Sequence, residues 1–176
     1  MESPSLITRI DKKLLLLHII AAWLLAHSFY TFALLGSVDM IEVYRNTPPG
    51  ELSDLMQRKG YRTADVVYLL MGQVIAKQIG LIFAILISFL ICRIKRKHWI
   101  NAVLVLVIME AVAWIDSSVW NYTSYFFWWP GRLFAGLTSK IVTCGTILAL
   151  FSALVFLLSL SGKSFSQNQQ AVSEFA

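Results

Sequence analysis

Four long apolar stretches limit what this chain can fold into. They cover residues 14–36, 66–92, 99–118 and 141–160. Each is close to the roughly 20 residues with which an α-helix crosses about 30 Å of hydrocarbon. Soluble domains have about 25% charged residues, whereas this chain has 14% charged and 57% hydrophobic residues. The sequence therefore predicts an all-α integral membrane protein, a four-helix bundle formed by residues 1–163.

The distribution of lysine and arginine predicts which side of the membrane each connection faces. The N-terminus, the connection between the second and third stretches and the C-terminal segment hold Arg9, Lys12, Lys13, Arg93, Lys95, Arg96, Lys97 and Lys163. The opposite side holds Arg45, Arg58, Lys59, Arg62, Arg132 and Lys140. Because cytoplasmic segments carry the excess of positive residues, both termini are expected in the cytoplasm. We expect the membrane to be the inner, or plasma, membrane of a bacterial cell.

The net charge of +5 does not indicate nucleic-acid binding. The dense basic cluster, residues 93–97, adjoins two helix ends, where such a cluster sets topology and attracts anionic lipid. The expected partner is therefore the lipid bilayer. Residues 164–176 are rich in Ser and Gln, and this composition predicts a disordered polar tail.

Two charged residues interrupt the apolar stretches. Lys77 lies inside the second and Glu110 inside the third. A charge near the bilayer centre costs roughly 2.5 to 3.5 kcal/mol, so it needs a partner, a cavity or a function. At 1.5 Å per residue, Lys77, Glu110 and His27 fall at similar depths, roughly 12 to 16 Å below the outer helix ends. The sequence thus predicts an intramembrane polar cluster of Lys77, Glu110 and His27, joined by Gln73 and Asp116.

Two interpretations of this cluster stay open. In one, Lys77 and Glu110 form a buried ion pair that only fixes helix register. In the other, the cluster is a proton or ion relay, or a polar pocket for a headgroup or small solute. We expect no metal site, because His27, Glu110 and Asp116 lack the spacing of a ligand set. We also expect no cofactor.

Small residues recur every fourth position in two stretches and predict close helix packing. The second stretch carries Gly72, Ala76, Gly80, Ala84 and Ser88, and the fourth carries Gly145, Ala149 and Ala153. Small residues at this spacing form a groove that lets another helix approach closely. The sequence leaves open whether the two grooves face each other or face a second copy of the chain.

The two outer connections have distinct compositions. Residues 51–59 predict a short amphipathic helix, with Leu52, Leu55 and Met56 on one face and Gly60 as its stop. The second connection is an aromatic loop containing Trp120, Tyr122, Tyr125, Phe126, Phe127, Trp128 and Trp129. Aromatic residues gather at membrane interfaces, and this density also suits a lid over the polar cluster or a dock for a partner.

The sequence contains no GxSxG, HExxH, Walker or CxxC motif, so catalytic signatures are absent. Its length and topology are similar in outline to membrane immunity proteins against pore-forming toxins and to membrane accessory proteins of prokaryotic defence systems. We expect a non-enzymatic subunit that forms a homo-oligomer or joins a membrane-protein partner. The resulting complex would form or gate a pore. The alternatives are an ion- or proton-coupled small-solute transporter, an accessory or immunity protein, and a lipid-modifying enzyme.

Overall fold

The computed structural model describes residues 10–48 and 50–161, which contain helices and turns but no strand. Three segments are long and apolar enough to cross a membrane. The first, Lys12–Asn46, consists of α1 (Lys12–Ala33), η2 (Leu34–Ser37) and α2 (Val38–Asn46). The others are α4 (Thr63–Ile94) and α7 (Leu137–Ser161). The remaining elements are α3 (Leu52–Arg58), α5 (Ile100–Ala111), α6 (Ala113–Trp128) and η3 (Pro130–Leu133). The expected disordered tail lies outside the described residues.

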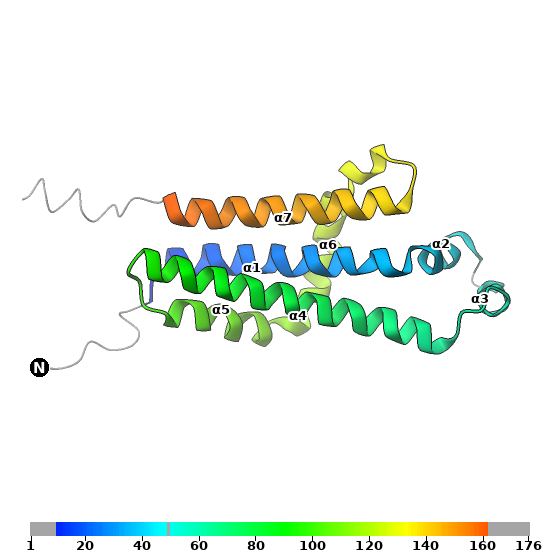
Figure 1. The fold of residues 1–176 in the computed structure, drawn as a ribbon, viewed down its shortest axis with the longest axis horizontal. Helices are drawn as coiled ribbons and strands as arrows, with labels where there is room; N and C mark the ends of the chain where they lie inside the picture. Colours follow the sequence, from blue (N-terminus) through cyan, green and yellow to red (C-terminus); the bar gives the residue numbers. More distant parts are fainter. Residues whose placement is uncertain (1–9, 49, 162–176) are drawn as a thin grey trace, which may run out of the picture.

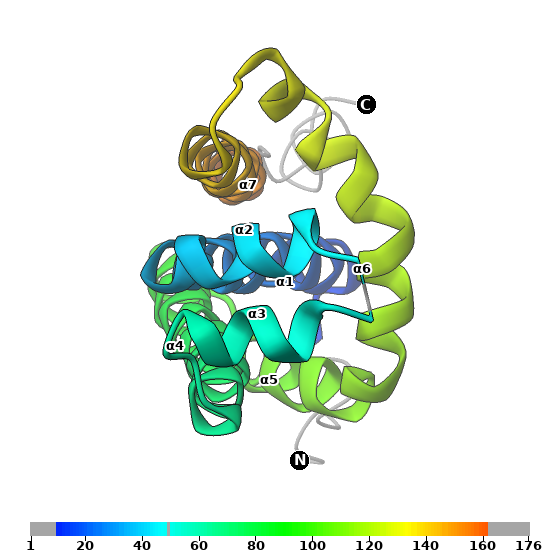
Figure 2. The same cartoon turned by 90° about the vertical axis from the view of Figure 1, so that its right-hand side faces the viewer.

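Helix α1 lies between α4 and α7 and packs closely against both (Figures 1 and 2). A Cβ atom added at Gly80 of α4 would lie 2.9 Å from the Cα of Ala26 in α1. A Cβ atom at Gly145 of α7 would lie 2.8 Å from Cζ of Phe32, also in α1. Glycine therefore permits both approaches, as expected where helices pack in lipid. The two small-residue grooves hold α1, rather than each other.

The residues of the two grooves differ in burial. In α4, Gly80, Ala84 and Ser88 are buried, Ala76 is half-buried and Gly72 is exposed. In α7, Gly145 is buried, Ala149 is half-buried and Ala153 is exposed. Each groove is thus occupied by α1 over only part of its length.

Polar side chains add specific ties between α1 and its neighbours. The Ser28 hydroxyl donates to the Gly145 carbonyl and the Ser152 hydroxyl to the Ala21 carbonyl, each at 2.8 Å. His18 bridges both partners, with Nδ1 2.6 Å from Oγ of Ser88 in α4 and Nε2 3.2 Å from Oγ of Ser159 in α7. Such bonds satisfy buried polar groups and fix the register of the three helices.

The start of α1 is bound to the turn between α4 and α5 by a hydrogen bond and an ion pair. Asp11 caps α1 by accepting from the Leu14 amide at 3.1 Å, and its second oxygen lies 3.0 Å from Nζ of Lys97. Its own amide donates to Oδ1 of Asn101 at 3.0 Å. Burial raises the pKa of Asp11, but the Leu14 and Lys97 hydrogen bonds outweigh this effect and hold the pKa below its ordinary value. The start of α1, the α4–α5 turn and the end of α7 lie at one end of the bundle (Figure 1).

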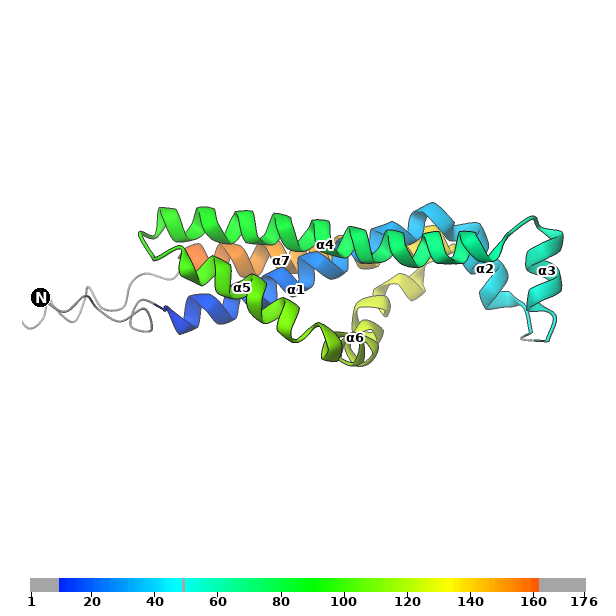
Figure 3. The same cartoon turned by 90° about the horizontal axis from the view of Figure 1, so that it is seen from below.

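The prediction that residues 99–118 form one straight helix is wrong. Helix α5 ends at Ala111, and α6 starts at Ala113 in a different direction. Figure 3 shows α5 running at a slant to the long helices before the chain turns into α6, and Figure 1 shows α6 crossing them. At 1.5 Å per residue, the 12 residues of α5 reach only about 18 Å. The third stretch therefore does not span a bilayer as a straight helix.

The two connections that were expected on the outer side are more helical than predicted. The predicted short helix is confirmed as α3, and Gly60 follows it with a φ of 82° that a side chain would disfavour. The prediction of an aromatic loop is wrong, because α6 continues to Trp128. The segment was expected to be a loop because it connects two apolar stretches, but α6 packs aromatic side chains against α1 and α7, and such tertiary packing can extend a helix beyond its apolar stretch.

The close approach of α4 to α1 predicts different effects for two glycines of the same helix. Gly80→Ala should destabilise the bundle by about 1 to 3 kcal/mol, because its Cβ would press on the α1 backbone. Gly72→Ala is the matched control, since nothing lies within 4 Å of a Cβ there. Its stability should stay equal or rise slightly. Thermal unfolding in detergent measures both, and equal melting temperatures would contradict this packing.

Candidate functional site

Three side chains from two helices meet at the buried carboxylate of Asp116, which belongs to a third helix. Oδ1 of Asp116 accepts from Nε1 of Trp23 at 2.6 Å and from Nε2 of His27 at 3.0 Å, while Oδ2 pairs with the ammonium of Lys77. The side chain of Asp116 is only 6% exposed and that of Lys77 is 26% exposed. These four residues are called the Asp116 cluster below. Its three donors compensate the cost of burying the carboxylate.

The helices place these groups by simple periodicity. Trp23 and His27 are four residues apart, so they lie on the same face of α1. Lys77 projects from the middle of α4, and Asp116 lies in the first turn of α6. A carboxylate in that position is also favoured by the positive end of the helix dipole. The break near Val112 is what brings this first turn to the side of α1.

One ring nitrogen of His27 has a special position. Because Nε2 donates to the carboxylate, Nδ1 is the remaining site for a proton or a hydrogen bond. Nδ1 is buried and has no hydrogen-bond partner among the described residues. The indole of Trp120 stacks on the imidazole, with ring centres 4.2 Å apart and planes 7° apart. Helix α6 thus contacts His27 twice, through a hydrogen bond to Asp116 and through the stacked ring of Trp120.

The structure does not bring the predicted pair together. Lys77 contacts Asp116, whereas Glu110 is exposed on α5. A straight helix through residues 99–118 would place Glu110 at the depth of Lys77, but the chain turns at Val112. Glu110 therefore lies on the exposed side of α5, whereas Asp116 lies in contact with Lys77. Of the other expected members, His27 belongs to the cluster, and Gln73 is buried one turn from Lys77 without a described hydrogen bond.

Trp23 is the member that sequence reasoning missed. It precedes His27 by one helical turn, and that spacing was the available signal. Within the described ranges, no three His, Cys, Asp or Glu side chains are placed to hold a metal ion. The cluster offers ionic and hydrogen-bonding chemistry instead.

Helix α6 depends on this cluster for its polar attachment. Among the described residues, every side-chain hydrogen bond from α6 to another element ends on Asp116. Apolar contacts add to this attachment, with Trp120, Phe127 and Trp128 packed against a small core of Leu24, Cys144 and Leu148. Replacing Asp116 with asparagine therefore removes the ionic part of the described contact between α6 and the bundle.

The predicted aromatic set is divided between two environments. Trp120, Phe127 and Trp128 are half-buried, while Tyr122, Tyr125, Phe126 and Trp129 are exposed. The guanidinium of Arg132 lies 4.3 Å from the ring centre of Tyr125, a cation–π contact. Trp120 stacks on His27 of the cluster, and Phe127 and Trp128 pack against the core that contains Cys144.

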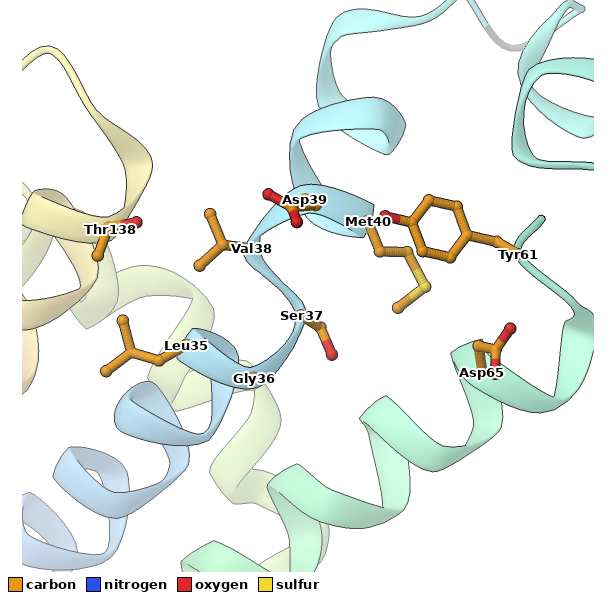
Figure 4. A pocket seen from close by; sticks show the side chains of 9 residues that line it. All are labelled: Leu35, Gly36, Ser37, Val38, Asp39, Met40, Tyr61, Asp65 and Thr138. Carbon is orange, nitrogen blue, oxygen red and sulfur yellow. The ribbon is translucent and has the colours of Figure 1, made fainter. Parts of the chain in front are cut away.

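A separate hollow of about 800 Å³ lies between the α1–α2 bend and the starts of α4 and α7. Met40 and Tyr61 point toward one another across it, and Asp39 and Asp65 lie at its rim (Figure 4). Asp65 accepts from the Arg62 amide at 2.7 Å and so caps α4. None of the residues that line the hollow belongs to the Asp116 cluster. Its two acids, Asp39 and Asp65, lie in the first turns of α2 and α4, where carboxylates commonly stabilise a helix.

The cluster predicts a coupling energy that distinguishes Asp116 from Glu110. In a double-mutant cycle, Lys77→Met and Asp116→Asn should couple by about 1 kcal/mol or more, because the two groups touch. Lys77→Met with Glu110→Gln should be additive within about 0.5 kcal/mol. Unfolding in mixed detergent micelles supplies the free energies. Coupling to Glu110 and additivity with Asp116 would show that the assignment is wrong.

Comparison of the chain with protein-family models, with characterised proteins and with solved structures finds no match. The function must therefore be inferred from the physical chemistry of the site.

Proposed function

We propose that this chain is a non-enzymatic integral membrane protein in which the Asp116 cluster is an ionic latch for a movable α6. In this proposal α1, α4 and α7 cross the membrane, both termini are cytoplasmic, and α6 lies along the outer interface. The working unit is an assembly with a second copy or another membrane protein, in which α6 acts as a gating or contact element. The convergence of the polar ties of α6 on Asp116 carries the proposal.

The position of Glu110 supports an interfacial α6. This exposed carboxylate lies at the end of α5, immediately before the chain turns into α6. An exposed charge at the bilayer centre is costly, so the junction is best placed near the outer headgroups. There, the exposed Tyr122, Tyr125 and Trp129 suit the amphipathic interface. Such a helix is reached by water, ions and partners, which a latch requires.

The packing of α1 favours an assembly over transport by the chain alone. Helix α1 fills the space between α4 and α7, and its Ala21, Ala22 and Ala26 are fully or nearly fully buried. A path for a solute through one chain would have to displace this core. A gate formed with a partner needs only the movement of α6.

Proton-coupled transport is the second candidate, and it rests on one observation. Lys77 is partly exposed, whereas Nδ1 of His27 is buried without a described partner. The cluster therefore connects an accessible cation to a buried proton acceptor through one carboxylate, an arrangement typical of a relay.

Release of the latch predicts a change in the reactivity of Cys144. This thiol is buried in α7 beneath aromatic side chains of α6. Asp116→Asn should raise its rate of maleimide labelling about tenfold, because a weaker ionic tie increases the population of the open state. Cys92, which is buried near the opposite end, should keep its rate in the same molecules.

Glu110→Gln is the matched control, since it removes a carboxylate outside the cluster. Its Cys144 should label at the wild-type rate. Continued protection of Cys144 in Asp116→Asn would contradict the latch. Equal acceleration at both cysteines would instead indicate unfolding and would also count against it.

Reconstitution separates the two candidate functions. If the chain needs a partner, liposomes containing the purified protein alone should show no proton flux above empty liposomes after a pH step, as measured with an enclosed pH-sensitive dye. Flux that is abolished by Lys77→Met and kept in Glu110→Gln would overturn the first proposal in favour of transport.

A further inference from the structure

A second hollow, of about 560 Å³, opens at the turn between α4 and α5. Its lining combines basic and apolar side chains, namely Phe89, Cys92, Arg93, Arg96, Lys97, His98 and Trp99. This turn lies at the bundle end that holds the start of α1 and the end of α7 (Figure 1). Its volume is in the range of small-molecule sites, which span about 300 to 1,000 Å³.

The charges of this hollow are incompletely compensated. Within the described residues, neither Arg93 nor Arg96 has an ion-pair partner, and both are exposed. Lys97 is paired with Asp11 at 3.0 Å, so its charge is largely matched by the protein itself. Two guanidinium groups thus remain for an anion. Guanidinium favours phosphate, because its planar fork gives two parallel hydrogen bonds.

Apolar side chains continue the hollow along the helices. Phe89 is 46% exposed and lies more than a turn inside the end of α4, and Trp99 is 54% exposed at the start of α5. In a membrane, Trp99 suits the headgroup level and Phe89 suits the acyl region. A basic pocket with an apolar wall matches a ligand that has both an anionic head and a hydrocarbon chain.

The backbone at Arg96 supports a role for its side chain. Arg96 has a φ of 53°, in the left-handed region, just beyond the end of α4. The turn is closed by bonds from Arg96 N to Arg93 O at 3.2 Å and from Lys97 N to Cys92 O at 2.8 Å. Glycine is the usual residue at such a position, because it has no Cβ. The residue at this position is nevertheless an arginine, and its side chain adds a positive charge to the lining of the hollow.

We propose that this hollow is a binding site for the phosphate headgroup of one anionic phospholipid in the cytoplasmic leaflet. Arg93 and Arg96 hold the phosphate, while Phe89 and Trp99 contact the start of an acyl chain. The site is separate from the Asp116 cluster and does not depend on the latch. Specific retention of one lipid distinguishes it from general attraction of anionic lipid to positive charge.

Native mass spectrometry of the full chain in detergent tests this site. With phosphatidylglycerol added, one bound lipid should survive activation at a lipid concentration where phosphatidylcholine is lost. Replacing both arginines, in Arg93→Gln with Arg96→Gln, should weaken this binding by about tenfold or more. Lys13→Gln is the matched control, because it removes an exposed charge near the same bundle end outside the hollow. It should retain the lipid within about twofold.

The outcomes are decisive in each arm. Equal retention of the two lipids, or an equal loss in Lys13→Gln, would show general charge attraction and overturn the proposal. Complete displacement by millimolar inorganic phosphate would show an anion site without a role for the acyl chain and would overturn it as well. Weaker binding in Phe89→Ala supports the lipid.

Arg96→Gly separates binding from folding. Glycine suits the positive φ, so this variant should melt at or above the wild-type temperature. It should nevertheless bind phosphatidylglycerol more weakly. Unchanged binding in a well-folded Arg96→Gly protein would contradict the assignment of this residue.

Discussion

The carboxylate of Asp116 is buried on a helix that crosses the bundle, and the arrangement around it follows from the need to compensate its charge. Trp23 and His27 approach it from α1, and Lys77 approaches from α4. Loss of one partner of such a buried pair leaves an uncompensated charge and costs about 3 to 5 kcal/mol. The same contacts that stabilise the carboxylate therefore also fix the position of α6.

Helix α1 is the common partner of the other elements. Small residues let α4 and α7 approach its backbone, and hydroxyl groups of Ser28 and Ser152 connect it to α7. His18 joins α1 to both long helices near one end, while His27 joins it to α6 toward the other. The two histidines thus have different surroundings. His18 meets neutral hydroxyl groups, whereas His27 meets an ion pair, so His27 is the better candidate for a functional group.

The sequence predicted the features that depend on long apolar runs. The three long helices are confirmed because long apolar runs have few alternatives to helix. The short helix α3, which was predicted from its apolar face and the Gly60 stop, is also confirmed. The packing of both grooves on α1 was not predicted, because the buried positions of α1 include leucine and histidine beside alanine and serine and so do not form a ladder of small residues.

The ion pair could be predicted only in part. The sequence identified Lys77 as a charge that needs a partner and placed His27 and Glu110 at a similar depth. It named Asp116 as a further member of the polar cluster but did not identify it as the partner of Lys77. It did not identify the break at Val112, because residues 110–114 contain neither Gly nor Pro. Without that break, Glu110 is the natural partner of Lys77. The packing of α6 aromatic side chains against α1 and α7 favours the direction that the chain takes after Val112. Such long-range contacts cannot be predicted from the local sequence around Val112.

The contact between Lys77 and Asp116 is the central claim, and solid-state NMR in lipid bilayers measures it most directly. Protein labelled with ¹⁵N-lysine and with ¹³C at the aspartate and glutamate carboxyls should show a dipolar contact between the Lys77 ammonium and an aspartate. This account predicts that the contact is absent in Asp116→Asn and unchanged in Glu110→Gln. A contact that persists in Asp116→Asn and disappears in Glu110→Gln would contradict it.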